Sequence, residues 1–417
     1  MSERLDPAEL HPLLERLEGF TDAPPGATRP VYGPAWCAAQ SWLAGEAERR
    51  GLAVTADWAG NLFLHPPRLA AGARALFVGS HVDTVAHGGR YDGAYGAVAG
   101  LLLAAARLGA EGAPVVGFVT SEEEGSRFPG SMMGARSLLG LATRQEYQTL
   151  RDRDGVTWAE ALAAARPAAR LGAGEPGAPP FAPAAMLELH IEQGPVLEAE
   201  GLALGIVEHV AGYRRLRAHV TGAARHSGTT PMGRRRDALA AAAEMVLAAE
   251  AAAREAGEPA VATAGRAQAE PGLFNVVPGA CELWLDVRHA DPAALERLER
   301  DLLERCHAIA TRRRVDLALE TASLQDPVPL SRPLADAAAA LAAERRIAHR
   351  RMNSGAAHDA MIFAQAGVPA LMLFVPCRDG ISHSPDEYAE PAQLAGGVSF
   401  AAALIERLAA RPELARA

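Results

Sequence analysis

Residues 79–100 read GSHVDTVAHGGRYDGAYGAVAG and lie between the apolar run ALFV and the alanine-rich segment LLLAAARLGA. The run before them is typical of a buried strand, and the segment after them is typical of a helix. His81 and Asp83 come where the strand ends, and a glycine-rich loop then carries Asp92 to the start of the helix. Because glycine permits tight turns, this loop can bring Asp92 back over the strand end. The stretch therefore predicts a strand, a loop and a helix with three polar groups at one point.

These three side chains allow two interpretations each. Alternate residues of a strand face the same way, so the Asp83 carboxylate could hydrogen-bond the His81 ring and orient its other nitrogen toward a metal. The alternative is a local polar pair without a metal. Asp92 could be a metal ligand, or it could cap the helix that begins near Gly93. The stretch alone leaves these alternatives open.

Three more apolar runs have the pattern of buried strands, and each also ends in residues that bind metals or transfer protons. APVVGFVTSEEE ends in Glu123 and Glu124, AAMLELHIEQG reaches His190 and Gln193, and VPALMLFVPCRDGISH continues to His383. Helical patterns lie between these runs. The sequence therefore predicts an α/β fold with ligands beyond the carboxyl ends of the strands.

The segment from 212 to 325 follows a different pattern. Its elements have the order strand, helix, strand, strand, helix, strand, which is that of a ferredoxin-like (βαββαβ) sandwich. We therefore expect a sheet-and-helix catalytic domain, formed by residues 1–211 and 326–417, that binds the metal. Residues 212–325 are expected to form a second domain inserted into it.

Composition excludes several classes of function. A net charge of -9 does not fit the basic surface that nucleic-acid binding requires. Four widely spaced cysteines without a C-x-x-C pair are typical of free thiols in a reducing compartment. The N-terminus lacks the pattern of a signal peptide, and no uncharged helical run reaches the roughly 20 residues needed to span a bilayer. We expect a soluble cytoplasmic protein that binds neither nucleic acid nor a membrane.

Five residues at the strand ends can be grouped around two metal ions: His81, Asp92, Glu124, His190 and His383. If Asp92 bridges the ions, His81 and His190 complete one site, while Glu124 and His383 complete the other. Each ion then has three protein ligands and an open position for a shared water, as in catalytic zinc sites. We expect two divalent ions per chain, zinc first, with manganese or cobalt as alternatives that the same ligands suit.

Several segments carry a resemblance to a known family: GSHVDTV, SEEEGSRFPGS, LELHIEQGPVLE, RHSGTTPMGRRRDA, FNVVPG, LDVR, SGAAHDA and GISHSPDE. In this order they resemble the motifs of M20-type metal-dependent amidohydrolases. Within these, the chain is similar to the branch of N-carbamoyl-L-amino-acid hydrolases, β-ureidopropionases and allantoate amidohydrolases. The resemblance covers nearly the whole chain. It implies cleavage of the ureido C–N bond of a small carboxylate substrate, through attack by a hydroxide that bridges the two metals.

The resemblance also implies roles for single residues. Glu123 matches the general base that activates the water, and Glu124 matches a metal ligand. His226 matches the histidine that polarises the scissile carbonyl or stabilises the tetrahedral intermediate, which is an oxyanion role. Asp83 keeps the orienting role beside His81 that its spacing suggests.

Substrate binding is implied for Gln193, Asn275 and Arg288, of which Arg288 offers a two-pronged guanidinium to a carboxylate. His226, Asn275 and Arg288 fall in the inserted domain, whereas all five metal ligands fall in the other. The resemblance therefore implies a lid that closes over the metals, and it also implies a homodimer formed through the lid domain.

The branch leaves the substrate open between two main candidates. Arg214 and Arg215 stand where allantoate amidohydrolases carry a substrate-contacting arginine, and Pro129 also favours that enzyme. Tyr213 stands where the family commonly has glutamine, which speaks against it. We expect an allantoate amidohydrolase, with an N-carbamoyl-L-amino-acid hydrolase or β-ureidopropionase as the alternative. A peptidase of the M20 type and a metal-binding module without catalysis are further alternatives, although a pure binding module has no use for the base Glu123.

Overall fold

The computed structural model describes residues 5–169 and 179–410, and the chain divides into two compact units. Unit 1 comprises Met1–Glu208, Pro329–Met352 and His358–Ala417, and unit 2 comprises His209–Val328 and Asn353–Ala357. The insertion thus runs from 209 to 328, where the sequence suggested 212 to 325. Unit 2 also takes in a short later segment that the sequence pattern did not assign to it.

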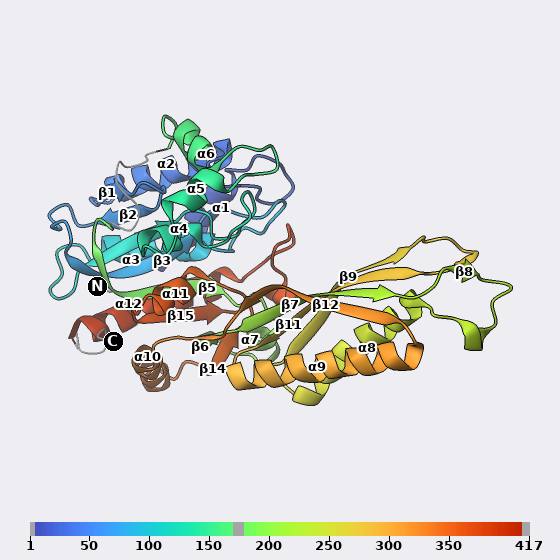
Figure 1. The fold of residues 1–417 in the computed structure, drawn as a ribbon. Helices are drawn as coiled ribbons and strands as arrows, with labels where there is room; N and C mark the ends of the chain where they lie inside the picture. Colours follow the sequence, from blue (N-terminus) through green and yellow to red (C-terminus); the bar gives the residue numbers. More distant parts are fainter. Residues whose placement is uncertain (1–4, 170–178, 411–417) are drawn as a thin grey trace. The chain divides into compact units, whose positions relative to one another are not determined.

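Unit 1 is built on a mixed sheet whose centre is parallel (Figure 1). The central order is β4-β3-β5-β15, and all three neighbouring pairs in this order run parallel. The strands of this sheet are β1 (Ala53–Ala56), β2 (Leu62–His65), β3 (Arg74–His81), β4 (Val115–Thr120), β5 (Ala182–Ile191), β6 (Leu204–Val210), β13 (Val328–Pro329), β14 (His349–Ser354) and β15 (Ala370–Val375). The four apolar runs singled out in the sequence are the four central strands, so their carboxyl ends lie at one edge.

Helices cover this sheet because its central strands are apolar on both sides. Every residue of β4 and β15 is buried, which is the continuous pattern expected of a parallel sheet covered on both faces. Helix α3 (Ala94–Ala106) packs on β3, and Gly100 allows this close approach, since a Cβ there would lie 2.2 Å from the carbonyl oxygen of Val78. The helix that follows Asp92 is therefore fixed against the strand that ends in His81.

The remaining helices of unit 1 are η1 (Pro7–Glu9), α1 (Leu10–Glu18), α2 (Pro34–Arg49), α4 (Met133–Leu138), α5 (Arg144–Thr149), α6 (Trp158–Ala165), α7 (Val196–Ala199), α10 (Arg332–Glu344), α11 (Asp359–Gln365), η3 (Arg378–Gly380) and α12 (Pro391–Ala410). Among the helices in the described ranges, none is both long and apolar enough to cross a membrane. The four cysteines are buried free thiols.

Unit 2 has a four-stranded antiparallel sheet in the order β12-β7-β11-β9. Its elements are β7 (Gly212–Thr221), β8 (Arg225–His226), η2 (Met232–Arg234), α8 (Ala238–Ala256), β9 (Val261–Glu270), β10 (Val276–Val277), β11 (Ala280–His289), α9 (Pro292–Arg313) and β12 (Asp316–Gln325). The helices begin at the capping residues Asp237 and Asp291, whose carboxylates accept main-chain N–H bonds. Helices α8 and α9 lie on one face of this sheet (Figure 1).

The strands of unit 2 alternate between buried and more exposed residues, as expected when helices cover only one face. In β7 the buried set includes Leu216, Ala218 and Val220, which belong to the core under the helices. The residues that alternate with them, such as Arg215 and His219, lie on the opposite face and are exposed. This open face carries polar and charged groups that unit 2 does not need for its own core.

Candidate metal centre and substrate groups

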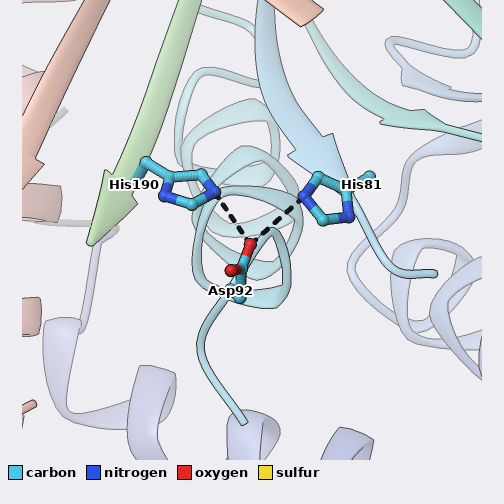
Figure 2. Close-up of side chains that lie close together, drawn as sticks. All are labelled: His81, Asp92 and His190. Atoms are coloured by element: carbon cyan, nitrogen blue, oxygen red, sulfur yellow. Dashed lines mark ion pairs between the residues drawn. The ribbon is translucent and has the colours of Figure 1, made fainter. Parts of the chain in front are cut away.

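Two histidines at neighbouring strand ends face one carboxylate. His81 ends β3 and His190 lies near the end of β5, and both rings point toward Asp92 (Figure 2). The distance from Nε2 of His81 to Oδ1 of Asp92 is 3.4 Å, and that from Nε2 of His190 to the same oxygen is 3.2 Å. All three side chains are buried. The structure thus brings together the three residues of the first predicted ligand group.

The other oxygen of Asp92 faces a second group. Nε2 of His383 lies 3.3 Å from Oδ2 of Asp92 and 3.4 Å from Oε2 of Glu124. This group is more open, because the His383 side chain is 48% exposed. One carboxylate therefore presents one oxygen to each group, which is the arrangement expected of a bridging ligand.

The hydrogen bonds of the histidine rings determine which nitrogen is left for a metal. Nδ1 of His81 lies 2.9 Å from the main-chain oxygen of Asp83, and Nδ1 of His190 lies 2.8 Å from that of Ile191. A carbonyl oxygen can only accept, so each Nδ1 carries the proton and each Nε2 is left with a lone pair. The main-chain N–H of Gly93 donates to Nε2 of His190, which agrees with this assignment.

Each Nε2 lone pair repels the carboxylate oxygen that it faces unless a cation lies between the two atoms. A bound metal ion or an added proton would relieve this repulsion. Tetrahedral zinc with bonds of about 2.0–2.2 Å places its ligand atoms roughly 3.3–3.6 Å apart, which is close to the spacings of 3.2–3.4 Å in both groups. The donor atoms of each group also lie within 4.8 Å of one another. These residues fit a divalent metal ion.

The charges of the two groups shift the pKa values of their members in a way that favours bound cations. Burial alone would raise the pKa of Asp92, but its close contacts with the rings of His190, His383 and His81 outweigh burial and hold that pKa well below its ordinary value. The hydrogen bond with Asp92 and the charge of Glu124 raise the pKa of His383 to about 9, although partial burial opposes this. The carboxylates therefore make the site strongly attractive to cations.

Glu123 lies beside the ligand groups without belonging to either. Its Oε2 is 3.7 Å from Nε2 of His81, and its side chain is buried. Burial raises its pKa well above the ordinary value, with the charges of Glu124, Asp359 and Asp83 adding to the shift and His81 opposing it. A carboxylate in this position can accept a proton near the metal groups without giving up a ligand.

Asp83 orients the site through different atoms than its spacing suggests. Its carboxylate Oδ1 lies 3.7 Å from Nδ1 of His81, which is too far for a hydrogen bond, and the main-chain oxygen of Asp83 accepts from the ring instead. The carboxylate accepts the main-chain N–H groups of Glu123 at 3.2 Å and Glu124 at 3.1 Å. The expected bond from the Asp83 side chain to the ring is therefore wrong. The side chain fixes the end of β4 relative to the end of β3.

The loop before α3 positions Asp92 as a ligand and not as a helix cap. The N-cap residue of α3 is Gly93, and no side chain makes a capping hydrogen bond there. Gly93 has a φ of 63°, and a Cβ at this position would lie 2.4–2.5 Å from atoms of the His81 ring. Any other residue would therefore push the loop away from His81. This geometry excludes the capping role that the sequence had left open.

Glu387 is a site residue that the sequence reasoning missed. One of its carboxylate oxygens accepts the N–H groups of Tyr91 at 2.7 Å and Asp92 at 3.1 Å, and the other lies 3.0 Å from the hydroxyl of Ser382. The Ser382 hydroxyl is also 2.8 Å from Oδ2 of Asp92. The only signal in the sequence is that Glu387 follows His383 by four residues in GISHSPDE. Glu387 connects the loop of His383 with the loop of Asp92.

We expect Glu387→Ala to weaken metal binding, because the main-chain N–H groups of Tyr91 and Asp92 lose their acceptor. Partners that orient metal ligands are typically worth about 10- to 100-fold in affinity. Competition with a chelator of known affinity would measure the change. Asp386→Ala is the matched control, since Asp386 is exposed and its carboxylate makes none of these contacts. Equal metal affinity in both variants would contradict the role of Glu387.

Gln193 lies at the two ligand groups, two residues after the end of β5. Its Nε2 donates to Oδ2 of Asp92 at 2.7 Å and lies 3.2 Å from the hydroxyl oxygen of Ser382. Among the described residues, its buried Oε1 has no hydrogen-bond partner. Its backbone adopts a φ of 57°, which is unusual for a residue other than glycine and common at functional sites. The amide oxygen is thus an acceptor held close to Asp92.

His226 lies on β8, one of two short paired strands of unit 2, and Asn275 directly precedes the other, β10. His226 pairs with Val276 in the β8–β10 ladder, and the N–H of Ser227 donates to the main-chain oxygen of Asn275. The N–H groups of Gly228 and Thr229 lie 3.2 and 3.3 Å from Nδ1 of His226. Nδ1 therefore accepts, and the exposed ring carries its proton on Nε2 as a hydrogen-bond donor.

Arg215 and Arg288 share one carboxylate on the open face of the unit 2 sheet. Asp286 Oδ2 lies 2.9 Å from Nε of Arg215, and Asp286 Oδ1 lies 2.7 Å from Nε of Arg288. Arg214, the other arginine considered from the sequence, is buried and pairs with Glu299 and Asp326. Arg215 is therefore the exposed member of this arginine pair. The four substrate candidates of unit 2 form two sets, Arg215 with Arg288 and His226 with Asn275.

Comparison with known proteins identifies a family and several relatives that match most of the chain. The family model described as Peptidase family M20/M25/M40 matches residues 77–407. An allantoate amidohydrolase of Escherichia coli (strain K12) is 35% identical over 395 residues, which are 92% of this chain and 93% of that protein. An N-carbamoyl-L-amino-acid amidohydrolase of Paenarthrobacter aurescens is 35% identical over 393 residues, 90% of this chain and 92% of that protein.

A solved structure matches the fold over almost the whole length. It is a crystal structure of an amidase of the hydantoinase/carbamoylase family from Burkholderia multivorans, with a TM-score of 0.90 and 32% sequence identity. The match covers 98% of this chain and 99% of that one. The likeness therefore includes the sequences of both units.

Proposed function

The chain belongs to peptidase family M20/M25/M40, and we propose that it uses two divalent metal ions to hydrolyse the ureido C–N bond of a small carboxylate. The two relatives described above, which match about nine-tenths of the chain, are amidohydrolases, so the protein is a hydrolase of non-peptide C–N bonds. Allantoate is our first candidate substrate. An N-carbamoyl-L-amino acid, or the 3-ureidopropionate of a β-ureidopropionase, is the alternative.

One observation carries the metal-dependent mechanism. Nε2 atoms of His81 and His190, each left with a lone pair, face Oδ1 of Asp92, while Nε2 of His383 faces Oδ2. A single bridging carboxylate with a ligand group on each side is the arrangement of two-metal hydrolases. We propose zinc for both sites, with manganese or cobalt as alternatives, since histidine and carboxylate ligands suit all three.

When bound, the metal ions would polarise the ureido carbonyl and lower the pKa of the attacking water. Glu123 accepts the proton of that water as its oxygen bonds to the ureido carbon, and returns a proton to the departing nitrogen as the C–N bond breaks. The carbamate formed in this step decomposes to carbon dioxide and ammonia or an amine. Glu124 and the histidines would hold the ions in place, and the Asp83 carboxylate keeps Glu123 and Glu124 in register.

The chain supplies groups for each part of the substrate. The unpartnered Oε1 of Gln193 suits an N–H of the ureido group. His226, with its proton on Nε2, donates to the oxygen of the tetrahedral intermediate, and Asn275 binds the substrate beside it. Arg215 and Arg288 bind the carboxylate, since guanidinium groups pair with carboxylates through two parallel bonds.

We further propose that unit 2 is the ferredoxin-like lid that delivers His226, Asn275 and the two arginines to the substrate. The order of its long elements, β7-α8-β9-β11-α9-β12, supports this assignment. The homodimer and the cytoplasmic location stay predictions of the sequence. Small-angle scattering with and without a substrate analogue would report closure as a decrease in the radius of gyration.

A substrate comparison tests the proposed reaction. Protein depleted of metal and reloaded with zinc, manganese or cobalt is expected to release ammonia from allantoate or from an N-carbamoyl-L-amino acid. The substrate with the higher kcat/KM identifies the enzyme, and a dipeptide serves as the control that should remain intact. Absence of turnover with every metal, or preferred cleavage of the dipeptide, would refute the proposal.

A further inference from the structure

The open face of the unit 2 sheet holds two arginines in an arrangement that one aspartate organises. Asp286 on β11 is the cross-strand neighbour of Arg215 on β7, and Arg288 follows two residues later on the same face. Nε of Arg215 donates to Oδ2 at 2.9 Å, while Nε and Nη2 of Arg288 donate to Oδ1 at 2.7 Å and Oδ2 at 3.1 Å. Both oxygens of one carboxylate are thus used by guanidinium groups.

Two further contacts fix the orientation of the pair. Nη1 of Arg288 donates to the main-chain oxygen of Gly355 at 2.8 Å, within the same unit. The ring of Tyr213 lies beneath both guanidinium groups, with its centroid 4.4 Å from Cζ of Arg215 and 5.9 Å from Cζ of Arg288. The arginines are therefore held by a carboxylate, a carbonyl and an aromatic ring.

The arginine pair retains a positive charge and N–H donors that can bind a ligand. Two guanidinium groups and one carboxylate leave one net positive charge. Burial would raise the pKa of Asp286, but the hydrogen bonds of Arg288 and Arg215 outweigh it and lower that pKa, so the residue stays ionised. Arg215 donates its Nε–H to Asp286 and is 48% exposed, so within the part of the chain that the structure describes its four other N–H donors are available to a ligand. One positive charge with outward N–H groups matches one carboxylate.

We infer that Asp286 is a positioning residue, whose carboxylate joins Arg215 and Arg288 into one receptor for a single carboxylate group of the substrate. This inference rests on the proposed function, in which the two arginines bind that group. Asp286 acts through the arginines and does not touch the reacting atoms. The ring of Tyr213, which stands where the family commonly has glutamine, packs against both guanidinium groups of this receptor.

Kinetics of Asp286→Asn tests the inference. For the better ureido carboxylate, KM is expected to rise by about 10- to 100-fold while kcat stays within about 3-fold, because hydrogen bonds to charged groups are worth that much in binding. For the neutral primary amide of the same substrate, the KM of Asp286→Asn should differ little from that of the wild type. Glu282→Gln is the matched control, because Glu282 lies on the same face of β11 and bonds Trp284 but neither arginine. Its KM should not change.

A KM for the carboxylate that is unchanged or lower in Asp286→Asn would overturn the inference. An equal rise in KM for the neutral amide would also overturn it, since Asp286 would then support the structure of the site in general and not the binding of the carboxylate. Thermal unfolding of both variants shows whether the comparison is made on folded protein.

A second measurement does not depend on turnover. In nitrogen-15 spectra, the Nε–H signals of Arg215 and Arg288, assigned through Arg215→Lys and Arg288→Lys, should both shift or broaden in Asp286→Asn. They should stay in place in Glu282→Gln. If the wild type hydrolyses no ureido carboxylate, the proposed function fails, and these signals still decide whether Asp286 positions the arginines. Signals that do not move in Asp286→Asn refute the positioning role.

Discussion

Replacing Glu123 by glutamine is expected to lower kcat by about 10²- to 10⁴-fold, the usual contribution of a general base, while the metal content stays at the wild-type level. Glutamine has nearly the same shape and can keep the main-chain bond to Asp83, but it cannot accept a proton. The separation of activity from metal content is possible because Glu123 lies 3.7 Å from His81 and belongs to neither ligand group. Steady-state kinetics and elemental analysis of the same preparation measure the two quantities.

The neighbouring residue supplies the matched control. Glu124→Gln removes a charged ligand that lies 3.4 Å from Nε2 of His383, so the protein should lose metal from the second group as well as activity. If Glu123→Gln loses metal and Glu124→Gln keeps it, the roles of the two glutamates are exchanged. If Glu123→Gln retains full turnover, the proton acceptor is another group.

Asp92→Ala is expected to remove metal from both groups and to abolish turnover, because each group loses its shared carboxylate oxygen. The wild type should bind about two ions per chain, and His383→Ala, which alters only the second group, should retain about one. Asp92→Ala should bind none tightly, with affinity reduced by more than about 100-fold at each group. Calorimetric titration of metal-depleted protein would give the number of ions and their affinities.

The numbers of ions bound by the wild type and by the two variants distinguish a carboxylate that bridges both groups from one that serves a single group. Retention of one tightly bound ion in Asp92→Ala would show that this carboxylate serves a single group. Loss of both ions in His383→Ala would show that the two groups bind only together. Circular dichroism of each metal-free variant separates these outcomes from a failure to fold.

The main features of unit 1 could be predicted because its central strands are apolar along their whole length. Four such runs, each followed by histidines or carboxylates, place those side chains at one edge once the strands run parallel. In this way the sequence predicted that His81, His190, His383 and Glu124 lie together, and the glycine-rich loop added Asp92 to them. The prediction needed only the strand pattern and the chemistry of the residues that end each strand.

The connections between these residues could not be read from the sequence. Glu387 orients Asp92 by accepting main-chain N–H groups, and a backbone contact between distant loops leaves no periodic signal. Asp286 is one of many acidic residues that alternate along strands, and only the register of β7 against β11 places it between two arginines. Residues His209–Val328 make up most of unit 2, but its segment Asn353–Ala357 comes from a part of the chain with no boundary pattern.

The rings of His81 and His190 are oriented by main-chain oxygens, and this has a consequence for how the centre tolerates mutation. A substitution at Asp83 or Ile191 changes a side chain but leaves the carbonyl that accepts from the ring. The main chain at the strand ends therefore sets the direction of these two nitrogens, and a side-chain substitution at a neighbouring position does not change that direction. The glutamate pair lacks this protection, since a single change at Asp83 removes the acceptor of both its N–H groups. Inherited variation should thus be freer at Ile191, which supplies only its carbonyl, than at Asp83, whose carboxylate also aligns the base.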